Sequence, residues 1–309
     1  MKKVFVIIVT YNGMKWLPDC LATVTNSAVP ISIIVIDNNS TDETVPFIKH
    51  NYNNIILIEQ QVNLGFGKAN NIGMSYALKK EADYVFLLNQ DTRIQFDTLE
   101  KLVSVADKNP EYGIISPLQL DYSGSSLEEC FYFFMSENNK TFYSDAVVGN
   151  TIKELYKVSF IQAAAWLLPR KTLLTVGGFD PIFYHYGEDN NYCQRTLFHG
   201  LKIGVCPFTS IQHDSTAKLM VEEPLFSERY FKNYHLSVLK KYCNINNDIG
   251  KKEMLYEIKK NQKSSFKSFF KCNIVHAKGY FKKAKILKNL RFSILESRKN
   301  NLSKQPNYL

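Results

Sequence analysis

Polar side chains able to bind a charged ligand or a metal ion stand directly after three apolar runs of this sequence. The runs cover residues 4–9, 31–36 and 84–88. In an open α/β sheet, ligands bind beyond the carboxyl ends of the parallel strands, so side chains that follow such runs converge on one crevice. We therefore expect one polar site from the residues that end or follow them, which are Thr10, Asn12, Asp37, Asn38, Asn89 and Asp91.

Asp91 is the strongest metal-ligand candidate in this set, because it follows a buried run and the next basic residue is Arg93. An Mg²⁺ or Mn²⁺ ion that bridges a diphosphate needs few protein oxygens, since phosphate oxygens and water complete its shell. His213 follows another strand-like segment, and a neutral imidazole suits Mn²⁺ well enough to complement Asp91. The alternatives are a cap for a helix over 97–108 and a structural histidine.

Asp37 could accept a hydrogen bond from the N–H of a pyrimidine base. The alternative is a helix cap or turn residue, a role that Ser40 to Asp42 already offer.

A glycine-rich turn, containing Asn63 and Gly65, precedes the helix expected over about 68–80. Such a turn lets amide groups approach a ligand closely and points a helix N-terminus towards phosphate. A dinucleotide fingerprint would need a third glycine where Asn70 stands and would follow the first strand. We therefore expect phosphate contacts here and no nicotinamide cofactor.

Two carboxylates, Glu188 and Asp189, open the helix expected over 188–201. A helix N-terminus stabilises an anion, typically by about 0.3–1 kcal/mol, which keeps Asp189 ionised and able to accept a proton near neutral pH. The alternative is that both acids merely complement the helix dipole.

These residues need a sheet and covering helices to position them. Continuous apolar runs are typical of strands buried on both faces, and their alternation with helical patterns indicates βαβ units and a mostly parallel sheet. Residues 121–158 are polar and low in helical periodicity, so we expect a loop or hairpin there, and the last ten residues should be frayed. Another strand is expected over 55–59, and further helices over 15–27 and 42–51.

The charge distribution separates an acidic body from a basic tail. Residues 1–228 hold 18 basic and 25 acidic side chains, a net −7, whereas residues 229–309 hold 20 and 4, a net +16. A chain of 309 residues with 45% hydrophobic residues can bury a large domain, which we place at residues 1–225. A basic, mostly helical region should follow over 226–309.

Six cysteines without metal-ligand spacing indicate a reducing compartment. The basic start precedes only six apolar residues, which predicts a buried strand rather than a signal peptide. No apolar run reaches the roughly 18 residues that span a bilayer, so we expect a soluble catalytic portion.

Together the motifs resemble those of family 2 glycosyltransferases, in the same order and spacing over about residues 3–215. The glycine-rich turn and the Asn-Gln-Asp motif are most similar to those of bacterial rhamnosyltransferase-type members, which build surface polysaccharides. The motifs are Thr10-Tyr11-Asn12, Asp37 with Asn39 to Asp42, Asn63-x-Gly65, Asn89-Gln90-Asp91, Gly178-Phe179-Asp180, and Glu188-Asp189 with Arg195.

This resemblance implies a GT-A fold, which is a Rossmann-like, mostly parallel α/β sheet flanked by helices, with a nucleotide-binding half over about 1–110 and an acceptor-side half over about 111–225. It implies an inverting enzyme that moves a sugar from a dTDP-rhamnose- or UDP-hexose-type donor to an acceptor hydroxyl. Asp91 and His213 would hold Mn²⁺ or Mg²⁺, and Asp189 would be the general base. The donor would contact Thr10, Tyr11, Asn12, Asp37, Asn63, Gly65, Asn70 and Asn89, and the acceptor would contact Trp166, Gly178, Phe179, Asp180 and Glu188.

Three positions depart from the family pattern. Asn89 stands where many members carry the first acid of an Asp-x-Asp motif, which leaves one carboxylate for the metal. Asn70 replaces an arginine common in other subfamilies. Asn191 replaces the second aspartate of a Glu-Asp-x-Asp motif, which leaves Asp189 as the base in that helix.

Two other functions fit parts of the pattern. A nucleotidyltransferase would normally carry a glycine-rich basic loop after the first strand, where this chain has only Gly13 and Lys15. A non-enzymatic polyanion-binding protein could act through the basic, aromatic tail. The expected acceptor is a saccharide or a lipid-linked molecule. We favour contact of that tail with an anionic membrane, because a lipid-linked acceptor would explain it, and we expect no nucleic acid partner. The alternative is a solvated helical face. The expected location is cytoplasmic, peripheral on the inner face of the cell membrane.

Overall fold

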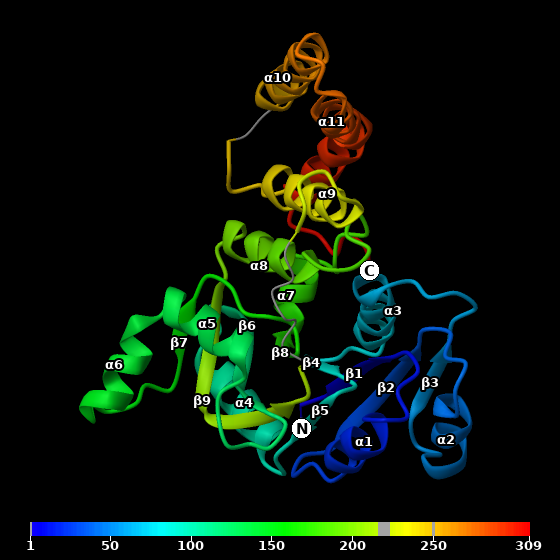
Figure 1. Cartoon of the computed structure of the whole chain (residues 1–309). Helices are drawn as coiled ribbons and strands as arrows, with labels where there is room; N and C mark the ends of the chain where they lie inside the picture. The colour runs from blue at the N-terminus through cyan, green and yellow to red at the C-terminus, as the bar shows by residue number, and fades with distance from the viewer. Residues whose placement is uncertain (1, 216–222, 249–250) are drawn as a thin grey trace. The chain divides into compact units, whose positions relative to one another are not determined.

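The computed structural model describes residues 2–215, 223–248 and 251–309 (Figure 1). Its chain forms two compact units. The first comprises Met1–Ala217 together with Lys304–Leu309, and the second comprises Lys218–Ser303. The boundary expected near residue 225 therefore lies at 217/218, and the last six residues group with the first unit.

The first unit contains a mixed sheet that has nine strands among the described residues, eight of them in the order β3-β2-β1-β4-β8-β6-β9-β5 while β7 pairs with β9. Strands β3, β2, β1 and β4 are mutually parallel and lie side by side in Figure 1. Strand β8 is antiparallel to both β4 and β6, whereas β9 is parallel to β6. The strands are β1 Val4–Thr10, β2 Ile31–Asp37, β3 Ile56–Glu59, β4 Tyr84–Asn89, β5 Thr92–Ile94, β6 Tyr112–Asp121, β7 Tyr156–Val158, β8 Ala165–Pro169 and β9 Lys202–His213.

Helices cover both faces of this sheet, as the uninterrupted apolar strands predict. Successive strand residues point to opposite faces, so Ile7 packs with the helix α3 residue Met74, whereas Ile8 packs with Leu17 of α1. The helices of the first unit are α1 Leu17–Thr25, α2 Thr44–Asn51, α3 Phe66–Lys79, α4 Thr98–Lys108, α5 Glu129–Asn138, α6 Lys140–Val148, α7 Arg170–Thr175 and α8 Glu188–Phe198.

The expectation of a loop or hairpin over 121–158 is wrong, because half of that segment forms the helices α5 and α6. The sequence of this segment is mostly polar, but Phe131 and Met135 lie one helical turn apart on α5 and are both fully buried. Glu128 caps α5 by accepting a hydrogen bond from the Phe131 amide. Two short capped helices therefore cover this part of the sheet.

The second unit contains three helices among its described residues, α9 Glu228–Tyr242, α10 Lys251–Phe270 and α11 Ile274–Asn301. Helices α10 and α11 form a hairpin around an apolar seam that includes Ile258 and Leu287. Arg298 of α11 donates hydrogen bonds to three carbonyl groups that follow or end α9. No helix in the described ranges is both long and apolar enough to cross a bilayer.

The last residues of the chain are ordered against the first unit rather than frayed. The amide of Gly178 donates a 2.8 Å hydrogen bond to the carbonyl of Asn307, and Leu309 packs against the hydrophobic core. Gly177 has a φ of +80°, and a Cβ atom there would lie 2.2 Å from the Asn307 carbonyl oxygen. The C-terminal tail, residues 304–309, therefore occupies space that only glycine leaves at position 177.

Gly177→Ala should destabilise the first unit more than Gly200→Ala does. Both glycines have a φ near +80°, where a side chain costs about 1–2 kcal/mol, but nothing lies within 4 Å of a Cβ at Gly200. The extra cost at Gly177 measures the clash with the tail. Urea unfolding of both variants tests this, and equal losses of unfolding free energy would show that the tail does not press on this turn.

Candidate active site

The carboxyl ends of the central parallel strands meet at one edge of the sheet. Thr10 pairs with Asp37 and Val9 pairs with Asn89, so the polar residues that end these three strands lie at the same level. A pocket of about 370 Å³ opens at this edge. Its lining consists of Val9, Tyr11, Asn38, Asn63, Gly65, Phe66, Asn89, Gln90, Asp91, Tyr184 and His185.

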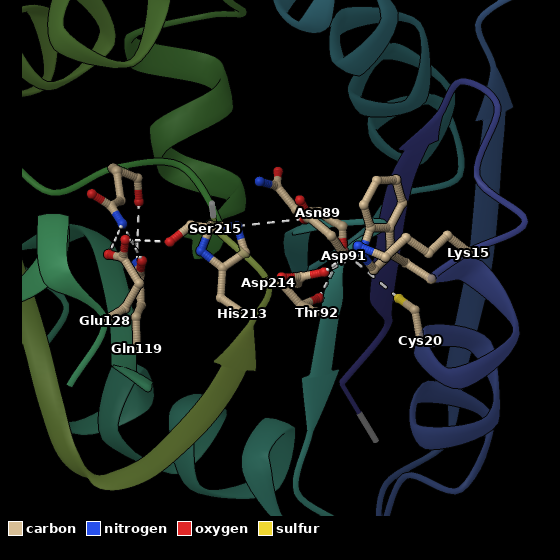
Figure 2. A network of polar contacts seen from close by, with 12 residues as sticks. Lys15, Cys20, Asn89, Asp91, Thr92, Gln119, Glu128, His213, Asp214 and Ser215 are labelled. Atoms are coloured by element: carbon tan, nitrogen blue, oxygen red, sulfur yellow. Dashed lines mark hydrogen bonds and ion pairs between the residues drawn. The ribbon is translucent and has the colours of Figure 1, made fainter. Parts of the chain in front are cut away.

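Asp91 and His213 meet although 121 residues separate them in the chain. Strand β5 pairs antiparallel with the end of β9, which sets Thr92 opposite His213, and the amide of Asp214 donates a 2.9 Å bond to the Asp91 carbonyl. The Nε2 atom of His213 lies 3.4 Å from Oδ1 of Asp91 (Figure 2). The sequence analysis expects these two side chains in one metal site, and in the structure they lie next to each other.

Several buried polar atoms of this site have no hydrogen-bond partner within the protein. They are Oδ1 of Asp91, Nδ1 of His213 and Oδ1 of Asn89. A buried polar group without a partner is costly, so such atoms are normally paired with protein, water or a ligand. The set of one carboxylate oxygen, one imidazole and one amide oxygen suits a divalent cation whose remaining ligands are phosphate oxygens and water. Among the residues that the structure describes, there is no cluster of three His, Cys, Asp or Glu side chains that could hold a metal alone.

The end of β9 is fixed on both sides of His213 (Figure 2). Asp214 accepts hydrogen bonds from Nε1 of Trp16 at 2.5 Å and from Nζ of Lys15 at 2.9 Å. The bond from Trp16, followed by the bond from Lys15, holds the pKa of Asp214 below its ordinary value. On the other side, Ser215 donates a short hydrogen bond to the buried carboxylate of Glu128. These contacts restrict the position of the histidine between them.

The loops after β1 and β2 are tied into one surface. Oδ1 of Asn12 accepts a 2.8 Å hydrogen bond from the Thr41 amide, and the buried Thr10 donates a 2.6 Å bond to Gln90. Asp37 is only 3% exposed; its Oδ2 accepts a bond from the Ser40 amide, whereas Oδ1 has no partner. One oxygen of Asp37 therefore shapes the turn, and the other remains able to accept a bond from a ligand.

The glycine-rich turn meets the pocket at Gly65. This residue has a φ of +78°, and a Cβ atom would lie 2.2 Å from the carbonyl oxygen of Tyr184. Helix α3 begins at the next residue, so its N-terminal amides lie at the pocket edge. Asn70, in contrast, is buried and donates to the Phe66 carbonyl within α3, so it does not line the pocket.

The residues expected to contact an acceptor lie mostly behind the pocket wall. Trp166 and Phe179 are fully buried, with ring centroids 6.1 Å apart, and Asp180 is 2% exposed. Asn71 holds Phe179 by bonding to both its amide and its carbonyl. This core, which includes Gly178, supports the segment that carries Tyr184 and His185 into the pocket; none of the four core residues lines the pocket itself.

Helix α8 starts after Gly187, which has a φ of +89°, so Glu188 and Asp189 lie in its first turn. Glu188 is buried and Asp189 is partly exposed. Arg195, further along α8, is fully buried and donates to the carbonyls of Val176 and Gly178. Burial lowers the pKa of its guanidinium group. The arginine of the motif is thus a structural anchor for the turn before α8.

The sequence analysis did not assign five of the lining residues to the site, which are Val9, Phe66, Gln90, Tyr184 and His185. Gln90 belongs to the Asn89-Gln90-Asp91 motif, in which only the asparagine and the aspartate were assigned to the site. Tyr184 and His185 lie between two recognised motifs, where an aromatic and polar run offered a signal. A second hollow, of about 680 Å³, lies near the start of β2 and has no carboxylate, histidine or basic side chain in its lining.

The fold and the pocket define the class as a nucleotide-binding α/β protein whose ligand lies at the carboxyl ends of parallel strands. Residues 5–169 match the model of Glycosyl transferase family 2, and the chain belongs to this family. It is therefore a nucleotide-sugar-dependent glycosyltransferase with a GT-A fold. Membership of this family favours glycosyl transfer over the nucleotidyltransferase and the non-enzymatic alternatives.

Two curated relatives illustrate the similarity. The dTDP-rhamnosyl transferase RfbF of Shigella flexneri is 24% identical over 235 residues, which cover 74% of this chain and 77% of the relative. The N-acetylglucosaminyl-diphospho-decaprenol L-rhamnosyltransferase of Mycobacterium tuberculosis (strain H37Rv) is 26% identical over 208 residues, which cover 60% of this chain and 67% of the relative.

Solved structures share the fold at low identity. TarS 1-349 of Staphylococcus aureus superposes with a TM-score of 0.55 at 15% identity, covering 97% of this chain and 90% of that chain. GalNAc-T7, solved with UDP, GalNAc and Mn²⁺, also superposes with a TM-score of 0.55 at 15% identity. The match covers 78% of this chain and 51% of the GalNAc-T7 chain.

Asp214→Asn should lower the free energy of unfolding by about 1 kcal/mol at pH 7, because it weakens charge-assisted hydrogen bonds. The pKa of this carboxyl is depressed by folding, so its contribution is present above the ordinary value and is lost as pH falls through the folded value. Wild type and variant should therefore converge towards pH 3 in urea unfolding. Glu81→Gln, which removes an exposed ion pair with Lys3, should change little at either pH, and a constant Asp214→Asn effect would contradict the assignment.

Proposed function

We propose that this glycosyltransferase moves a sugar from a dTDP-rhamnose- or UDP-hexose-type donor to a hydroxyl group of a saccharide or lipid-linked acceptor, with inversion, in the synthesis of a cell-surface polysaccharide. The names of the two rhamnosyltransferase relatives support this donor class, and the decaprenol relative supports a lipid-linked acceptor. The observation that carries the proposal is the contact between Asp91, which lines the pocket of a family 2 chain, and His213 behind it.

The nucleotide would bind along the joined loops after β1 and β2. Oδ1 of Asp37 is the acceptor available for a base N–H, and the pocket residue Tyr11 lies on the adjoining loop. Asn63 and Gly65 border the pocket at the start of α3, where backbone amides favour phosphate. This division leaves Asn89 and Asp91 facing the diphosphate end of the donor.

Asp91 and His213 would hold an Mn²⁺ or Mg²⁺ ion, and the carbonyl-bearing side chain of Asn89 lies at the same edge of the sheet. When bound, such an ion neutralises the charge that develops on the departing diphosphate. The contacts of Asp214 and Ser215 keep His213 in place, so the imidazole need not be reorganised when the donor binds. The mixed oxygen and nitrogen donors favour Mn²⁺ somewhat over Mg²⁺.

Asp189 is the proposed general base. Its position in the first turn of α8 favours the ionised form, and the preceding segment forms one wall of the pocket. In an inverting displacement the hydroxyl group attacks from the face opposite the leaving group, so the base should stand away from Asp91. Glu188 would then orient the acceptor or support the helix start.

We further propose that the enzyme works in the cytoplasm, at the inner face of the cell membrane, and that its basic second unit attaches to anionic lipid. The support is the net +16 of residues 229–309 and the lipid-linked acceptor named for one relative.

Asp91→Asn should remove most transfer activity and weaken the binding of Mn²⁺ in the presence of UDP or dTDP, while the fold persists. The substitution takes the charge from a metal ligand and leaves its shape almost unchanged. Donor turnover and calorimetric Mn²⁺ titration measure the two effects. Asp97→Asn removes a nearby exposed carboxylate and serves as the control, and full activity of Asp91→Asn, or of wild type in excess chelator, would refute the metal role.

Asp189→Asn should reduce the rate of transfer by about 10²–10⁴-fold, or roughly 3–5 kcal/mol, because the amide cannot take the acceptor proton. Donor affinity and Mn²⁺ binding should persist. Glu188→Gln should cost far less. Transfer rates and donor affinities of both variants decide the assignment, since an active Asp189→Asn beside an inactive Glu188→Gln would move the base to Glu188.

A further inference from the structure

Large apolar side chains are exposed where α10 turns into α11. The exposed fractions are 67% for Phe266, 59% for Phe269, 69% for Phe270, 46% for Ile274 and 66% for Val275. We call these five residues the aromatic tip. The rings of Phe266 and Phe270 are 4.6 Å apart, and those of Phe269 and Phe270 are 6.0 Å apart, so the three phenylalanines form one group. Several contiguous exposed apolar side chains mark an interaction site more often than scattered ones do.

Packing within the second unit does not require these side chains. The seam between α10 and α11, which lie side by side in Figure 1, is already filled by buried residues such as Met254, Ile258 and Leu287. Ser265 of α10 also donates a 2.7 Å hydrogen bond to the Ala277 carbonyl of α11. The aromatic tip therefore projects from a hairpin that is held together without it.

The turn that carries the aromatic tip is well defined. The amide of Cys272 donates to the Phe269 carbonyl at 2.9 Å, and the amide of Asn273 donates to the Ser268 carbonyl at 3.0 Å. Cys272 has a φ of +56°, and the side chain of Asn273 caps α11 by accepting from the His276 amide. These bonds close the end of α10 and start α11, so the apolar side chains are presented by a formed turn.

The surroundings of the aromatic tip carry only positive charge. Residues 258–295 contain eleven lysines and arginines and no aspartate or glutamate. Lys263, Lys267, Lys271 and Lys278 are exposed within or beside the aromatic tip. A partner surface must therefore offer negative charge around an apolar layer.

We propose that the aromatic tip inserts into the interfacial layer of an anionic bilayer while the neighbouring lysines contact the lipid headgroups. Aromatic rings and aliphatic side chains beside lysines are the composition of interfacial membrane anchors. Ile274 and Val275 gain nothing from stacking on nucleic acid bases, and a second copy of the chain would bring like charge against like charge. The inference rests on the second unit alone, so it stands or falls independently of the chemistry assigned to the pocket.

An environment-sensitive fluorophore on Cys272 tests the insertion in the full-length protein. Cys130 and Cys272 are the two exposed cysteines and the other four are buried, so Cys130→Ser directs the label to the aromatic tip. Vesicles of phosphatidylcholine with phosphatidylglycerol should shift the emission to the blue, and vesicles of phosphatidylcholine alone should not. The same label on Cys130 in a Cys272→Ser protein is the control and should not shift. Protein that sediments with anionic vesicles without a shift at Cys272 would overturn the proposal.

A matched pair of double variants separates insertion from charge. Phe269→Ser with Phe270→Ser should weaken binding to anionic vesicles by about tenfold for each ring that no longer enters the bilayer. Tyr256→Ser with Phe292→Ser removes two equally exposed rings, 65% and 69%, from other positions on α10 and α11 and should change binding little. Equal binding of the two double variants would overturn the proposal, and circular dichroism should show the same helix content in both.

Salt and competing partners complete the test. Raising salt from 0.1 M to 1 M shortens the Debye length from about 10 Å to about 3 Å, so wild-type binding should fall while the remaining binding still depends on Phe269 and Phe270. A Cys272 emission shift caused by single-stranded oligonucleotide, or by raising protein concentration without lipid, would overturn the proposal in favour of nucleic acid or self-association. Transfer to a water-soluble acceptor should be unchanged in both double variants, which separates this inference from the proposed function.

Discussion

The pairing of β5 with β9 is the constraint on which the candidate site depends. The parallel strands alone bring Thr10, Asp37 and Asn89 to one edge. They do not include His213, because that histidine ends β9, the last strand of the described sheet. Only the antiparallel register of Thr92 with His213, and the backbone bond between Asp214 and Asp91, set the histidine against the carboxylate. The three-residue strand β5, which follows Asp91 in the chain and pairs with the end of β9, therefore sets Asp91 beside His213.

Much of the fold could be predicted because its signals are local. The apolar runs at β1, β2 and β4 are uninterrupted, and each ends in polar residues, so both the strands and their shared edge follow from the sequence. Helices α5 and α6 could not be predicted, since only Phe131 and Met135 of α5 and Phe142 of α6 belong to the buried core. The order of the C-terminal tail depends on Gly177 and Gly178, more than 120 residues earlier, and no local pattern records that contact.

The candidate site could be predicted only in part from the sequence. Tyr11, Asn63, Gly65, Asn89 and Asp91 line the pocket as strand-end and turn residues should. The family motif around Gly178 was expected to contact the acceptor, but its residues lie within the core, because Phe179 and Trp166 pack on each other rather than face solvent. A sequence motif does not show whether its residues are buried in the core or face the ligand. Here the answer depends on tertiary contacts, in which Asn71 and Arg195 hydrogen-bond to the backbone of Phe179 and Gly178.

The return of residues 304–309 to the first unit makes the second unit an insertion, so the catalytic unit is completed only when the end of the chain has been made. Leu309 joins a core whose other members are already synthesised by residue 205. The 86 residues from Lys218 to Ser303 must be translated in between, which at about 5–20 residues per second takes roughly 4–17 s. A nascent chain that has reached residue 303 therefore contains every strand of the described sheet but still lacks the residues that pack on Gly177 and Gly178.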